Sequence, residues 1–226
     1  MTTRFPGFAV VSQRDHWDPV TAGVVLRRLA PPAALRFFDP HEQATCHALT
    51  RQLLDLEADN PVPVVAMIDT RLAEEQTDGW HYADLPSDGE AWRQSLAHLD
   101  EDAWVRCGRS FAEADAHDQA SVIDGVQTHD DAVDWHGLPA RRIWSLWTRY
   151  ACTAFYSHPF AFDEMGFPGP AFPRGYKNVG IDRREPFEVA DAEPSDPVPG
   201  RPGRRDRRPA GRTTSADDGR RAEETA

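Results

Sequence analysis

The sequence predicts a mainly α protein, a compact bundle of about five helices. Three observations support this class. Apolar residues recur at intervals of three and four, capping residues precede these segments, and no apolar/polar alternation extends beyond four or five positions. Hydrophobic residues make up 40% of 226, enough for a sizeable core. We expect an N-terminal arm packed on the body over residues 1–38, a helical domain over 39–189 and a disordered Pro/Arg-rich tail over 190–226.

The N-terminal arm is predicted to be irregular. Short apolar runs over residues 8–11 and 24–26 are interrupted by prolines, which cannot donate a backbone hydrogen bond. This segment can wrap against the body or form a short strand pair, and the pattern leaves both alternatives open. The interrupting prolines are Pro6, Pro19, Pro31 and Pro32.

The first bundle helix begins at a clear capping signal. Asp39 can cap the helix, Pro40 suits its first position, and Glu42 completes a capping box. The apolar stripe that follows ends near residues 60–61, and a second helix over 64–76 repeats the spacing. The stripes consist of Cys46, Leu49, Leu53 and Leu56 in the first helix and Val65, Ile68 and Leu72 in the second.

Three further helices follow a polar loop. Apolar positions over 92–104 predict a third helix that stops at Gly108, and a fourth begins near Asp115. A fifth covers residues 139–157. Because the fifth is rich in aromatic residues and apolar on more than half of its circumference, we expect it at the centre of the bundle.

The charge distribution limits the possible partners. The chain has 25 basic and 37 acidic residues, a net charge of −12, which excludes a general nucleic-acid binder unless positive charge is concentrated locally. Arginines do gather after Ala190, but an equal number of carboxylates alternates with them, so the tail is neutral. The tail also lacks aromatic residues and is rich in proline, so it cannot offset its ordering entropy by burial. We interpret it as a solvated linker.

The cysteines and the apolar runs indicate the compartment. Cys46, Cys107 and Cys152 form no C-x-x-C pair, which favours a reducing environment, and Cys46 and Cys152 are expected in the core. No run approaches the roughly 18 apolar residues of a spanning helix, and we recognise no export signal. We expect a cytoplasmic protein, or a periplasmic or extracellular one only if a signal-bearing partner exports it.

Residues 157–180 are the most unusual stretch. Five aromatic residues, four prolines and four glycines in 24 positions exclude a long regular element, yet the stretch is too apolar for a solvated loop. Such a segment must pack against the bundle or against a partner.

Three parts of the sequence carry a family resemblance. They are an opening helix that begins at residues 37–42, the residues Ile68, Asp69 and Leu72, and the motif Phe155-Tyr156-Ser157-His158-Pro159 followed by Gly166-Phe167-Pro168-Gly169. Together they resemble subunit 3, the small subunit, of gluconate 2-dehydrogenase, and the resemblance spans residue 37 to about residue 180. The sequence departs from the family at 161–163, where Ala-Phe-Asp replaces Gly-Gly-Asn, and at 174–177, which extend beyond the usual end.

The resemblance implies a non-catalytic accessory subunit of an oxidoreductase complex. The implied partner is a large FAD-dependent oxidoreductase of the glucose-methanol-choline class that acts on a sugar, sugar acid or alcohol, and a cytochrome subunit is a further candidate. Because FAD and the catalytic base belong to the large subunit in this family, we expect no catalytic residue and no cofactor in this chain, and we expect no metal either. The charge distribution and the short apolar runs predict neither nucleic-acid binding nor membrane insertion. The candidates for the partner interface are Phe155, Tyr156, His158, Pro159, Phe160, Phe162, Phe167, Pro168, Phe172 and Tyr176.

Two alternatives remain open. A stand-alone α-helical metal-dependent hydrolase could use His129, Asp130, Asp134 and His136, because imidazoles and carboxylates at short spacing can hold a divalent ion. These residues lie between predicted helices, where they are also ordinary loop and capping residues, and we favour that interpretation. The second alternative is an interaction module for an unrelated protein, which differs from the accessory subunit only in its partner.

For the isolated Asp69, a cap or surface role is favoured over acid–base chemistry.

Overall fold

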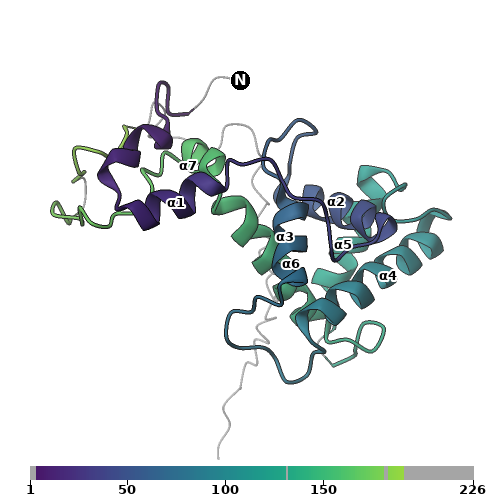
Figure 1. The fold of residues 1–226 in the computed structure, drawn as a ribbon. Coiled ribbons are helices and arrows are strands. Elements are labelled where there is room, and N and C mark those ends of the chain that lie inside the picture. The colour runs from purple at the N-terminus through teal and green to yellow at the C-terminus, as the bar shows by residue number, and fades with distance from the viewer. Residues whose placement is uncertain (1–3, 131, 181–182, 191–226) are drawn as a thin grey trace, which may run out of the picture. The chain divides into compact units, whose positions relative to one another are not determined.

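The computed structural model describes residues 4–130, 132–180 and 183–190. All of them belong to the first of the two units, residues 1–192 and 193–226, into which the chain divides. They form seven α-helices and one 3-10 helix, and this part of the chain contains no β-strand (Figure 1). The prediction of a mainly α fold is therefore confirmed. The predicted disordered tail lies, beyond Ala190, outside the described residues.

The bundle has the five helices that the sequence predicts. They are α2 (Pro40–Leu54), α3 (Val64–Ala73), α4 (Asp88–Cys107), α5 (Ala116–Gln127) and α6 (Ala140–Tyr156). Helix α6, which the sequence predicts at the centre, contacts each of the other four, as α2 also does. Its Trp147 is fully buried, and the indole N–H donates to Ser95 Oγ of α4 over 2.9 Å. Trp147 and Tyr150 of α6 are among the largest fully buried side chains, and their rings lie 5.8 Å from those of Trp135 and Trp92, respectively.

The predicted capping signals position these helices. Asp39 Oδ1 accepts the backbone N–H groups of His41 and Glu42, both over 2.8 Å, and Glu42 Oε2 accepts the N–H of Asp39 over 3.0 Å. This reciprocal pair is the expected capping box. Helix α4 ends at Gly108, whose φ of 69° places it in the left-handed region that glycine adopts without steric cost.

Asp69 of α3 explains the pattern of Ile68, Asp69 and Leu72. The Asp69 side chain is buried, and its two oxygens accept the backbone N–H groups of Arg36, Phe37 and Phe38 over 2.8, 2.9 and 2.9 Å. Hydrogen bonds from several amides stabilise a buried carboxylate that would otherwise be costly to desolvate. Asp69 therefore fixes the chain just before α2 begins.

The N-terminal arm is helical, and no strand pair forms among its described residues. It contains the 3-10 helix η1 (Val10–His16) and the helix α1 (Pro19–Arg27). Asp18 accepts the N–H groups of Val20 and Thr21 over 2.9 and 3.2 Å, and Pro19 occupies the first position of α1. This Asp-Pro signal is the same one that begins α2.

Helix α7 (Pro159–Met165) packs against the 3-10 helix η1 (Figure 1). Buried side chains from η1, α1, α7 and the turn between η1 and α1 form a hydrophobic cluster separate from the bundle core. We call it the small cluster; it contains Val10, Trp17, Val25 and Phe162. The backbone N–H of Val10 also donates to Asp163 Oδ1 over 2.6 Å. The small cluster thus joins segments about 150 residues apart.

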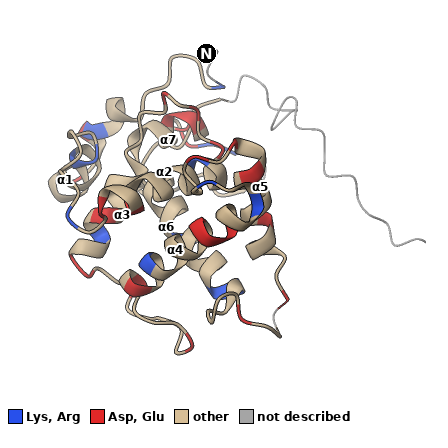
Figure 2. Cartoon of the chain, turned by 90° about the vertical axis from the view of Figure 1, so that its right-hand side faces the viewer, with Lys and Arg blue, Asp and Glu red and all other residues tan. Residues whose placement is uncertain are grey.

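Acidic residues occur on α4 and α5, and basic residues are spread over several elements (Figure 2). Among the described residues, none of the helices combines the length and the apolar character that crossing a membrane requires.

Candidate partner-binding surface

The segment predicted to contact a partner comprises the end of α6, helix α7 and an irregular stretch to Tyr176. His158 caps α7, because its Nδ1 accepts the N–H of Phe160 over 3.1 Å. Burial lowers the pKa of His158, so the ring stays neutral and can accept this hydrogen bond at neutral pH. Arg28 anchors the same corner by donating to the Ser157 carbonyl over 2.6 Å.

Four of the ten interface candidates are buried within the chain itself. They are His158, Pro159, Phe162 and Pro168. Phe162 packs in the small cluster with Trp17, and His158 serves the α7 cap. These four are therefore removed from the candidate interface, because side chains that pack internally present no surface to a partner. Sequence reasoning could not separate them, since burial against the chain and burial against a partner demand the same apolar residues.

The Gly-Phe-Pro-Gly motif has an internal packing role. A Cβ at Gly166 would lie 2.7 Å from Phe5 Cε1, and a Cβ at Gly169 would collide with the Trp17 ring. Both glycines also have positive φ, 65° and 81°. The motif therefore accepts two aromatic side chains of the N-terminal arm at close range.

The remaining candidates reach solvent. Phe155, Phe160 and Phe167 are half-buried, whereas Tyr156, Phe172 and Tyr176 are exposed. Met165 and Val179, which the sequence did not single out, are exposed as well. We call the five exposed large hydrophobic residues between the end of α6 and residue 179 the exposed aromatic surface: Tyr156, Met165, Phe172, Tyr176 and Val179.

The loop that carries Phe172 and Tyr176 is held in place. The buried Glu185 carboxylate accepts the backbone N–H groups of Lys177 and Asn178. Arg174 stacks over the Phe187 ring with 3.7 Å to the centroid and donates to Gln13 Oε1 over 3.0 Å. Because these contacts fix the backbone, an exposed aromatic side chain here loses less entropy on binding than one on a free loop.

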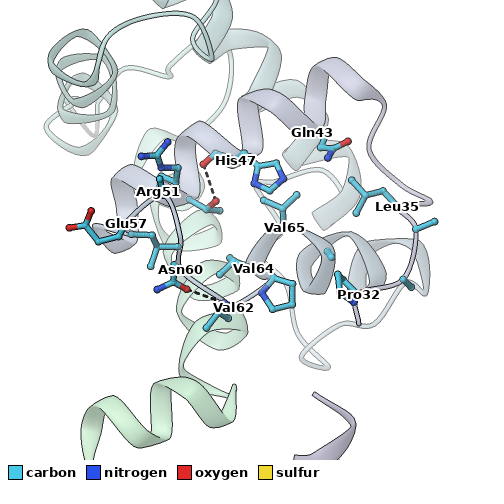
Figure 3. A pocket seen from close by; sticks show the side chains of 17 residues that line it. Pro32, Leu35, Gln43, His47, Arg51, Glu57, Asn60, Val62, Val64 and Val65 are labelled. Atoms are coloured by element: carbon cyan, nitrogen blue, oxygen red, sulfur yellow. Dashed lines mark hydrogen bonds between the residues drawn. The ribbon is translucent and has the colours of Figure 1, made fainter. Parts of the chain in front are cut away.

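A pocket of about 550 Å³ lies between α2, α3 and residues 32–35 (Figure 3). Its lining is largely apolar, with Val65 beside the His47 ring and Glu57 at the other end. Partial desolvation lowers the pKa of His47, so the ring is neutral at pH 7. The Thr50 hydroxyl donates to the carbonyls of Cys46 and His47 over 2.9 and 3.2 Å, so its proton is already used. The pocket therefore offers apolar side chains beside the charged Arg51 and Glu57.

The structure does not bring together the four predicted metal ligands. Asp130 accepts the N–H of Ala132 over 2.9 Å, as a loop residue, and the buried His129 Nε2 has no partner among the described residues. His136 instead faces α4, where its Nε2 lies 2.8 Å from Asp102 Oδ1. Within the described ranges, the one group of three possible ligands is His98, Glu101 and His136. Only His136 of the predicted set belongs to it, because the connection before α6 turns this side chain toward α4.

The cysteines divide between core and surface. Cys46 is fully buried, and desolvation raises the pKa of its thiol, as expected for a small core residue. Cys152 is exposed, contrary to the expectation from the apolar pattern of its helix. It lies on the face of α6 that does not contact the bundle core.

The comparison with protein families agrees with this architecture. The family model described as gluconate 2-dehydrogenase subunit 3 matches residues 40–169. The match begins at the first residue of α2, includes all five bundle helices and α7, and ends at the glycine that accommodates Trp17. No curated protein and no solved structure matches the chain. Since the family model covers more than half of the residues, the chain belongs to the gluconate 2-dehydrogenase subunit 3 family.

Proposed function

We propose that the chain is a non-catalytic accessory subunit that binds and stabilises, or helps to mature, a large FAD-dependent oxidoreductase. The partner is of the glucose-methanol-choline class and acts on a sugar, sugar acid or alcohol. FAD and the catalytic groups lie in that partner, and a cytochrome subunit is a further member of the complex. The observation that carries the proposal is the exposed aromatic surface, which begins inside the family-matched region and continues just beyond it.

The composition of this surface supports a protein partner. Phe172 is 67% exposed and Tyr176 is 48% exposed on a loop that Glu185 ties back. Aromatic side chains of this kind are enriched at the energetic centres of interfaces, where truncating one costs about 2 kcal/mol or more. Burying such a side chain in an interface removes apolar area from water, and the fixed backbone keeps the entropic cost of binding small.

Co-expression tests the proposal directly. This chain, carrying an affinity tag, is produced with a flavoprotein of the glucose-methanol-choline class from the same genome, and the purified material is examined for bound flavoprotein by its flavin absorbance. We expect a stable complex and a larger soluble yield of the flavoprotein. A flavoprotein that is equally soluble and active without this chain, and is not retained by it, contradicts the proposal.

Matched variants locate the interface. The double variant Phe172→Ser, Tyr176→Ser should lower the affinity for the flavoprotein by about tenfold or more, because it removes two aromatic anchors. Val105→Ser on α4 is the control, because Val105 is 88% exposed and lies outside the exposed aromatic surface. An equal loss of affinity in the two variants would show that the interface lies outside the exposed aromatic surface.

A further inference from the structure

A cluster of histidines and carboxylates joins α4 to the connection before α6. His98 and Glu101 lie one turn apart on α4, and His136 lies in the connection. His98 Nδ1 is 3.2 Å and His136 Nδ1 is 3.4 Å from the same oxygen, Glu101 Oε2. Both Nδ1 atoms are therefore close to the same carboxylate oxygen at the surface of the protein.

A tight turn holds His136 in this position. Trp135 and Leu138 exchange backbone hydrogen bonds of 2.8 and 2.9 Å, and the two residues between them, His136 and Gly137, have φ values of 50° and 81°. A positive φ is uncommon for a residue other than glycine, so the surrounding contacts must support it. Trp135 supplies them: it is buried, and its indole N–H donates to Asp102 Oδ2 over 2.8 Å.

His136 lies between two carboxylates, one at each ring nitrogen. His136 Nε2 lies 2.8 Å from Asp102 Oδ1, and a carboxylate can only accept, so Nε2 carries the proton. A neutral ring then has a lone pair on Nδ1, which faces the Glu101 carboxylate at 3.4 Å. Two acceptors at this distance repel unless a proton or a metal ion lies between them.

The two distances to Glu101 Oε2 fit a metal ion, and the three possible ligand atoms all lie within 4.8 Å of one another. In a tetrahedral zinc site with Zn–N bonds of about 2.0–2.1 Å, neighbouring ligand atoms are about 3.4 Å apart. Asp102 has the position of the carboxylate that typically accepts the second N–H of a metal-bound histidine. Acidic residues on α4 add negative charge around the cluster (Figure 2).

We propose that His98, Glu101 and His136 bind one divalent transition-metal ion of the zinc type, with Asp102 orienting His136. This departs from the expectation that the chain holds no metal. The ion links α4 to the connection before α6, and a water molecule completes the coordination. The two imidazole rings are stacked, with centroids 4.5 Å apart and planes within 5° of parallel. The His98 ring must therefore rotate about its Cβ–Cγ bond and give up the hydrogen bond between its Nδ1 and Glu101 before both lone pairs point at the ion, while His136 keeps its hydrogen bond to Asp102. This torsion is soft, and the cluster is open to solvent.

The experiment uses the full, untagged chain after dialysis against a chelator. Titration with zinc chloride, followed by calorimetry, should show one equivalent bound. At a free zinc concentration of about 100 times the Kd, the Tm should rise by about 5 °C or more, whereas magnesium should leave it unchanged.

Variants decide whether this cluster is the site. His98→Ala, His136→Ala should abolish binding of the equivalent, and Glu101→Gln should weaken it by tenfold or more. The control variant His81→Ala, His117→Ala removes two exposed histidines elsewhere and should bind like the original chain. Circular dichroism of the metal-free variants verifies that each is folded. Asp102→Asn should weaken binding by about 10–100-fold.

Two results would overturn the proposal. One is zinc binding that persists in the His98→Ala, His136→Ala variant. The other is the absence of a saturable equivalent in the original chain, which would show that hydrogen bonds alone hold the cluster together.

Discussion

The bundle and the small cluster are two hydrophobic assemblies of the same chain that are specified in different ways. The bundle core draws on all five helices α2–α6, and many of its members are fully buried, whereas the small cluster has four buried residues. The family model covers the whole bundle but only the α7 side of the small cluster. The bundle therefore carries the stability of the family fold, and the small cluster attaches the N-terminal arm to it.

The largest expected effect is in the bundle, at Trp147. Trp147→Ala removes a fully buried indole and its hydrogen bond to Ser95, and should lower the free energy of unfolding by about 4 kcal/mol. Trp104→Ala is the control, because Trp104 is 63% exposed, and should change it by about 0.5 kcal/mol or less. Chemical denaturation measures both. Similar losses in the two variants would contradict a core centred on α6.

The next effect concerns the link between α3 and the entry to α2. Asp69→Ala leaves the amides of Arg36, Phe37 and Phe38 without their acceptor and should cost about 3 kcal/mol. Asp39→Ala removes only the α2 cap and should cost about 1 kcal/mol. Denaturation curves of both variants give the comparison. An Asp69→Ala variant as stable as Asp39→Ala would show that water replaces the lost carboxylate.

Steric contact with the arm is tested at Gly169. Gly169→Ala places a methyl group against Trp17 at a φ of 81° and should destabilise the small cluster by about 2–3 kcal/mol. Gly79→Ala is the matched control: its φ is 76°, nothing lies within 4 Å of the added Cβ, and it should cost about 1 kcal/mol. Limited proteolysis reports the stability of the arm, and denaturation reports the stability of the bundle. The two measurements together show which of the two assemblies is destabilised. An arm equally protected in both variants would contradict the packing role of the motif.

Local signals predicted the bundle because each helix carries its own start, period and stop. The capping box at Asp39, the apolar stripe of α6 and the terminal Gly108 are all readable within a few residues. The Asp18-Pro19 signal of α1 is equally local, and it could have been recognised by analogy with Asp39-Pro40. The small cluster could not be predicted in this way, because the hydrogen bond between Val10 and Asp163 joins residues that are far apart in the sequence and that no local pattern relates.

The same distinction governs the candidate site. The apolar, proline-rich composition of the segment after α6 correctly indicates that it packs, but not against what. Phe162 turns inward to Trp17 while Phe172 stays exposed, and only the fold separates them. The predicted set of metal ligands was wrong for the same reason. His136 lies close to His98 and Glu101 of α4, and not to the other predicted ligands, which are its neighbours in the sequence.

The smallest expected effect is the pH dependence of the small cluster at Asp163. Burial raises the pKa of Asp163, and the hydrogen bond from Val10 opposes this only in part. A carboxyl group whose pKa is higher in the folded state binds its proton more tightly there. Its contribution to stability is therefore present at low pH and is lost as the pH rises through the folded pKa.

Asp163→Asn tests this sign, because the amide oxygen can still accept the N–H of Val10 but does not ionise. At pH 7 the variant should raise the free energy of opening the small cluster by about 0.5 kcal/mol or less, and the effect is small because Asp163 is partly solvated. The difference should close as the pH falls toward 4. Amide exchange of Ser12, which donates to the Ala9 carbonyl within η1, reports the opening of the small cluster in both proteins. A difference of opposite sign at pH 7 would show that the Val10 hydrogen bond outweighs burial and that the ionised carboxylate holds the arm.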